Sequence, residues 1–111
     1  MDLSLATVVE RLAQRPGVVS VTFCTVRGLV IQSSHASVDE ANKQALAFAP
    51  MVKSALEAYA TVGVKEQPEV LTVRSAKLEW IVTLADAQGG AISGASPSDF
   101  FFLVAREVDK K

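Results

Sequence analysis

The chain has little of what metal and thiol chemistry requires. Its 111 residues include one cysteine, Cys24, and one histidine, His35. A single cysteine cannot form an internal disulfide, and one cysteine with one histidine cannot build the usual zinc site. We therefore expect Cys24 to be a small buried hydrophobic residue and His35 to lie in an exposed loop. No metal and no cofactor are expected.

The chain also lacks an excess of either charge and any long apolar run. Eleven basic residues stand against twelve acidic ones, so the formal net charge is -1. A nearly neutral chain has no field that attracts phosphate backbones, and nucleic acid is not expected as a partner. The apolar runs are too short for a membrane span, and the first residues lack the pattern of a signal peptide. We expect a soluble protein of the cytoplasm.

Motifs of catalysis are missing as well. Gly89 and Gly94 have the spacing of a phosphate-binding loop, but Ala95 and Ser96 occupy the positions where that motif has Lys followed by Ser or Thr. Any Ser-His or Cys-His mechanism would depend on His35, which the polar surroundings place in a loop. We therefore expect that the protein is not an enzyme.

What the chain does have is a high apolar content, since half of its residues are hydrophobic. Its length and this composition are typical of one compact domain spanning residues 1–111. Apolar residues at helical spacing predict a first helix between Leu5 and Leu12. Strand composition follows over Val18–Cys24, with Val19, Val21 and Phe23 expected on one face, and resumes over 29–32 after a glycine turn.

A long helix is predicted next, because Ser37 and Glu40 in "SVDE" form a capping box and helix formers continue to about Tyr59. Pro50 falls inside this helix and predicts a bend. Three further strands are expected at Val70–Ser75, Leu78–Ala85 and 100–107, with a flexible hairpin loop over 86–98. The order of helix, two strands, long helix and three strands predicts an α+β fold with a single antiparallel five-stranded sheet.

Two features leave alternatives open. Small residues such as Ala41, Ala45, Ala49 and Ala55 form a stripe that suits close packing on the chain's own sheet or on another helix. Trp80 shares a strand face with apolar neighbours, which is typical of a core residue, although an interface anchor has the same pattern.

Three stretches of the sequence together resemble the roadblock family of dynein light chains. "RPGVVSVTFCTVRGLVIQSS" from Arg15 is similar to the first hairpin of that family. "VLTVRSAKLEWIVT" from Val70 is similar to its Arg-Ser-Lys-rich strand pair, and "SDFFFLVARE" from Ser98 is similar to its closing strand. The order and spacing of these stretches cover most of the chain.

This resemblance implies a non-catalytic dimer in which each protomer contributes one strand edge and its long helix. The two sheets would join into a continuous sheet backed by paired helices, and Arg74 and Glu79 would set the register instead of performing chemistry. The implied dimer interface consists of Val70, Leu71, Thr72, Val73 and Arg74 in the strand and Ala41, Ala45, Phe48 and Val52 in the helix.

The resemblance further implies a light chain of a dynein motor that binds the dynein intermediate chain and supports motor assembly or cargo attachment on microtubules. The expected location is the cytoplasm and its cytoskeleton, including a cilium or flagellum, and the dimer partner is a second copy or a related light chain. Related members form scaffolds that regulate small GTPases, so a regulator of a Ras-like small GTPase is the alternative. Partner-binding residues are expected on the long helix: Lys43, Lys53, Leu56 and Tyr59.

Overall fold

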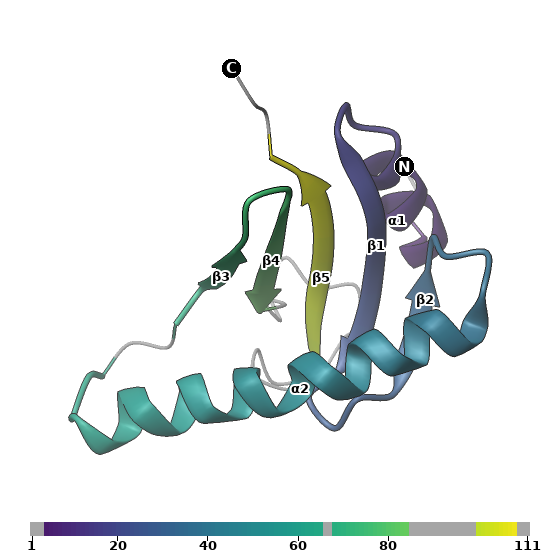
Figure 1. The fold of residues 1–111 in the computed structure, drawn as a ribbon. Helices are drawn as coiled ribbons and strands as arrows, with labels where there is room; N and C mark the ends of the chain where they lie inside the picture. Colours follow the sequence, from purple (N-terminus) through teal and green to yellow (C-terminus); the bar gives the residue numbers. More distant parts are fainter. Residues whose placement is uncertain (1–3, 66–67, 85–99, 109–111) are drawn as a thin grey trace.

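The computed structural model describes residues 4–65, 68–84 and 100–108 of the chain. Within these residues there are two helices and five strands (Figure 1). The loop expected over 86–98 lies outside the described residues. In chain order the elements are α1 (Leu5–Ala13), β1 (Val18–Thr25), β2 (Val30–Ser33), α2 (Val38–Thr61), β3 (Val70–Arg74), β4 (Leu78–Leu84) and β5 (Phe100–Glu107).

The five strands form one antiparallel sheet in the order β2-β1-β5-β4-β3. The last strand of the chain therefore lies at the centre of the sheet, where it joins the β1–β2 hairpin to the β3–β4 hairpin. This arrangement confirms the predicted α+β fold with a single five-stranded antiparallel sheet. Its two edges are β2 and β3.

The two helices cover opposite faces of the sheet. Successive side chains of a strand point to opposite faces, so Phe101 and Leu103 of β5 contribute to the core under α2, and Phe102 contributes to the core under α1. Phe23 is 1% exposed on the α1 face, and its ring centroid lies 4.6 Å from that of Phe102. The buried residues under α2 are Cys24, Ala45, Ala49, Val52, Val82, Phe101 and Leu103, and those under α1 are Val9, Val21 and Phe23.

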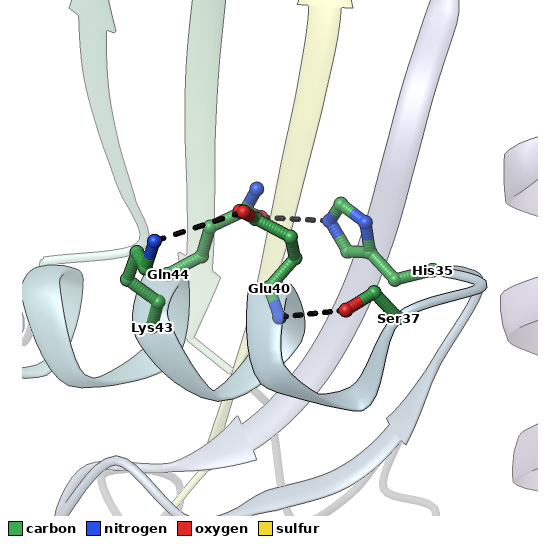
Figure 2. Close-up of polar contacts among 5 residues, drawn as sticks. All are labelled: His35, Ser37, Glu40, Lys43 and Gln44. Carbon is green, nitrogen blue, oxygen red and sulfur yellow. Dashed lines mark hydrogen bonds and ion pairs between the residues drawn. The ribbon is translucent and has the colours of Figure 1, made fainter.

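Helix α2 begins where the sequence predicts. The Ser37 hydroxyl oxygen accepts a hydrogen bond from the Glu40 backbone N–H at 3.2 Å (Figure 2). The Glu40 carboxylate lies 3.7 Å from the ammonium of Lys43, one turn further on. Pro50 lies inside the helix, which nevertheless continues to Thr61 as one element. The predicted long helix is therefore confirmed, and packing on the sheet outweighs the cost of the internal proline.

Strand β1 departs from the expected alternation near its start. Its register against β5 shifts between Val18 and Ser20. As a result Val18 packs beside Val21 in the core under α1, whereas Val19 is 57% exposed. The prediction that Val19 shares a face with Val21 and Phe23 was wrong, because an extra residue in the strand reverses the alternation.

Candidate protein-interaction site

Strand β3 is an open edge of the sheet. It pairs with β4 on one side, and no described strand lies on its other side. Every residue of β3 except Leu71 is exposed, including Val70 at 57% and Val73 at 36%. An edge of this kind presents unpaired backbone groups and is a template for another chain. The expectation that Val70–Arg74 forms an exposed sheet edge is confirmed, whereas its contact with a second protomer stays a prediction.

Helix α2 extends past this edge, so that its C-terminal end projects beyond β3 (Figure 1). Between the helix and the β3–β4 hairpin lies an apolar hollow. Along the same part of the helix, the apolar side chains of Met51, Tyr59 and Val62 are exposed. We call β3 together with residues 51–62, which are the end of α2 and its C-cap Val62, the open-edge surface. The hollow is lined by Val52, Ala55, Pro68, Glu69, Val70, Leu71, Val82 and Leu84.

The helix residues that the sequence assigned to a dimer interface do not all reach this surface. Ala41, Ala45 and Val52 are buried in the protomer, and Ala45 and Val52 belong to its own core. Their side chains let α2 approach its own sheet, so the structure accounts for them as residues of the protomer core, and their part in a dimer interface stays a prediction. Phe48 is half-buried, and its ring lies 5.0 Å from that of Trp80, which is therefore also part of the core packing.

The four expected partner-binding residues do not form one cluster. Lys43 and Lys53 are exposed, but they are ten positions apart, which corresponds to about 15 Å along a helix. Leu56 is half-buried and packs on the core, and Tyr59 is exposed. Of these four residues, Tyr59 and the exposed part of Leu56 contribute apolar contact area to the open-edge surface.

A row of charged residues crosses three strands at one end of the sheet. In the strand register, Glu79 of β4 lies directly opposite Arg74 of β3 on one side and directly opposite Arg106 of β5 on the other. The Arg106 Nε atom donates to the Glu79 carboxylate at 2.8 Å, and this carboxylate side chain is only 16% exposed. Opposite charges on directly paired residues favour this strand register over a slipped one. A register-setting role for Glu79 fits this geometry.

The residues with nucleophilic or metal-binding potential lie apart. Cys24 is buried under α2, and burial raises the pKa of its thiol from 9.0 to about 12. His35 is half-buried, not exposed as expected, because its Nε2 atom lies 2.9 Å from the Gln44 Oε1 atom (Figure 2). Among the described residues, no group of three or more His, Cys, Asp or Glu side chains could hold a metal ion. Nor is any helix in that part of the chain long and apolar enough to cross a membrane.

The opposite edge, β2, is a poorer template. It is four residues long, and its register against β1 is irregular between Phe23 and Cys24. Short strands and bulges blunt the pairing capacity of an edge. Beside it, Leu46 of α2 packs against Gly28 while both Leu46 and Leu29 remain exposed. Sequence reasoning missed this exposed pair, since nothing in a linear pattern places the hairpin turn beside the helix.

Comparisons with known proteins agree with this architecture. No family model and no curated protein matches the chain. Among solved structures, a Roadblock/LC7 domain from Streptomyces avermitilis is similar with a TM-score of 0.77 and 18% identity, over 95% of this chain and 79% of that one. MglB of Myxococcus xanthus is similar with a TM-score of 0.73 and 16% identity, over 92% and 74%. The gliding protein MglB of Thermus thermophilus has a TM-score of 0.67 and 10% identity, over 90% and 68%.

The chain therefore has a roadblock-type fold, as its sequence resemblance suggested. Identities of this size establish the fold alone.

Proposed function

We propose that the protein is a dimeric, non-catalytic scaffold that regulates a Ras-like small GTPase. The observation that carries the proposal is the open-edge surface, where an unpaired strand edge lies beside exposed apolar residues of α2. A surface of this kind suits protein association, in which a second copy pairs along β3 and the two helices become neighbours.

The sequence alone favoured a dynein light chain over a GTPase regulator, and the comparisons reverse that order. The similar structures come from bacteria and include a gliding protein, whereas dynein is a motor of eukaryotic cells. They give no support to a dynein intermediate chain as the partner, or to microtubules or cilia as the location. We therefore place the GTPase regulator first and propose the cytoplasm as its location.

A scaffold without catalytic groups can change a GTPase cycle only by differential binding. It shifts the GTPase toward the nucleotide state that it binds more tightly, by no more than the difference between the two affinities. Apolar contacts would come from exposed residues of α2 such as Met51 and Tyr59. Lys53 lies on the same stretch of helix and would add a salt-sensitive contact to an acidic partner surface.

The experiment uses the purified protein and purified Ras-like GTPases of its source organism. Each GTPase is loaded with GDP or with a non-hydrolysable GTP analogue, and binding is followed by calorimetry at two salt concentrations. We expect one nucleotide state to bind more tightly and Lys53→Ala to reduce the salt dependence. A matched control is Lys43→Ala, since Lys43 lies outside the open-edge surface.

A peptide from a dynein intermediate chain serves as the competing ligand. Binding of this peptide with no binding of any GTPase would instead support the hypothesis of a dynein light chain. Equal affinity for both nucleotide states would contradict a regulatory role, because such binding shifts no equilibrium.

A further inference from the structure

Pro50 lies near the middle of helix α2 and interrupts its hydrogen bonds. The helix runs on both sides of it as one element of 24 residues. Proline has no N–H, so the carbonyl of Leu46, four residues earlier, cannot accept the usual helical bond from position 50. The proline ring also crowds this carbonyl. Residues 46–50 are therefore the weak point of the helix, where a bend costs least.

The part of α2 before Pro50 is held on several sides. Ser37 caps its start, and His35 of the preceding loop contacts Gln44, with 2.9 Å between the Nε2 and Oε1 atoms (Figure 2). Leu46 lies so close to the turn between β1 and β2 that a Cβ atom on Gly28 would be only 2.8 Å from the Leu46 Cδ2 atom. Movement of this part would break packing on the sheet and on the turn. Its buried residues are Ala41, Ala45 and Ala49.

The part of α2 after Pro50 is held much less. Val52 is its only buried residue, and Ala55 and Leu56 are half-buried. The apolar hollow lies between this part and the β3–β4 hairpin, so the packing beneath it is incomplete. Just after the end of the helix, a Cβ atom on Gly63 would meet nothing within 4 Å. The end of α2 thus lies in open space beyond β3 (Figure 1).

We propose that Pro50 is a hinge, about which residues 51–61 move toward and away from the β3–β4 hairpin while residues 38–49 stay fixed on the sheet. A hinge of this kind needs only a few residues that absorb a change in backbone dihedral angles. A helix segment with few buried contacts gains little by keeping one position. The inference goes beyond the proposed function, because it concerns the single chain whatever that chain binds.

The hinge changes the shape of the open-edge surface. Its strand is fixed, because β3 pairs with β4 along its whole length without a shift of register. Its helical part moves and carries the exposed side chains of Met51 and Tyr59. Movement away from the hairpin widens the apolar hollow, and movement toward the hairpin closes it. A chain that binds here selects the helix position that fits it best.

Distances between two spin labels, measured by pulsed electron paramagnetic resonance, test the hinge in the full chain. The labels are attached to Lys77→Cys in the hairpin turn and Ala58→Cys in the moving part, which are both exposed positions. Labelled protein is mixed with an excess of unlabelled protein, so that distances within one chain dominate. The unsubstituted protein is the labelling control, since its own Cys24 is buried.

The expected spread follows from helix geometry. Residue 58 lies eight positions after Pro50, which corresponds to about 12 Å along the helix. A change of about 20° in the bend therefore moves this residue by about 4 Å. We expect the label pair to give a distribution with at least this spread, and Pro50→Ala, which restores the N–H, to narrow it.

Two controls isolate the hinge. A label on Lys43→Cys, paired with the same Lys77→Cys, reports on the fixed part and should give a narrow distribution with or without Pro50. Ser54→Ala favours helix in the moving part without restoring a hydrogen bond, so it should leave the Ala58→Cys distribution broad. Circular dichroism melting of each variant shows that it is folded.

Three results would overturn the hinge. A narrow distribution for the Ala58→Cys pair in the protein that retains Pro50 would show a fixed bend. A broad distribution that Pro50→Ala leaves unchanged would place the motion elsewhere in the chain. Equal narrowing by Ser54→Ala would assign the spread to unwinding of the helix end. Calorimetry with GTPases tests the proposed function separately, so its outcome and that of the hinge can be told apart.

Discussion

Replacing Val73 by lysine should separate the proposed dimer without unfolding the protomer. Val73 is 36% exposed on the edge strand, and pairing of a second copy along β3, as in the proposed function, would cover it. Burying a whole valine stabilises by about 1.5–3 kcal/mol, so covering a third of one contributes about 0.5–1 kcal/mol. Lysine removes this term and adds about 1–3 kcal/mol for a charged group beside an apolar strand.

The two-fold symmetry doubles the effect, because both copies carry the substitution. The loss is about 3–8 kcal/mol per dimer, which corresponds to a dissociation constant raised by a factor of about a hundred or more. Sedimentation equilibrium of the two proteins over a range of concentrations measures this change, and a thermal melt of each shows whether the protomer remains folded.

A matched control is Val19→Lys. It makes the same substitution at a more exposed strand residue, and β5 and β4 separate β1 from the β3 edge. We expect Val19→Lys to leave the dissociation constant unchanged. An unchanged constant for Val73→Lys, or an equal loss for both variants, would show that the dimer does not use β3.

Three further predictions concern the protomer. Phe23→Ala should lower the free energy of unfolding in urea by about 3–5 kcal/mol, because it empties a buried site between aromatic rings. The control Leu29→Ala, at an exposed position, should change this free energy by less than about 0.5 kcal/mol. Cys24 should resist alkylation at pH 8 in the folded protein and react at once in denaturant, and rapid alkylation of the folded protein would contradict its burial. Because its folded pKa of about 12 lies above the ordinary value of 9.0, the stability that the protonated thiol contributes should be complete below pH 9 and decline from there to pH 12. Ser37→Ala should reduce the free energy of unfolding by about 1 kcal/mol through loss of the helix cap, and Ser37→Asp, which also caps, should restore it.

Local pattern determined most of the fold. The capping serine, the helical spacing of apolar residues and the alternation along the strands depend only on neighbours within a few positions of the chain. The sequence therefore identified α1, α2 and all five strands with their ends within a few residues. It also identified β3 as an edge, through its resemblance to a family in which that strand pairs between protomers.

The tertiary structure decided which face each residue of α2 uses. Ala41, Ala45 and Val52 have the small or branched side chains of a helix interface, and a periodic pattern cannot say whether the opposing surface is the chain's own sheet or another chain. Only the packed structure shows them buried in the protomer, whereas Leu46, Met51 and Tyr59 of the same helix are exposed.

The position of β5 was likewise beyond the sequence. Its apolar residues predict a buried strand, but its place between β1 and β4 follows from long-range pairing that local pattern does not encode. That central position makes β2 and β3 the edges, and the hydrogen bonds of the β3–β4 hairpin then decide which backbone groups face outward. Strand composition is set by neighbouring residues, whereas the open edge of a sheet is set by which strands meet across the whole chain.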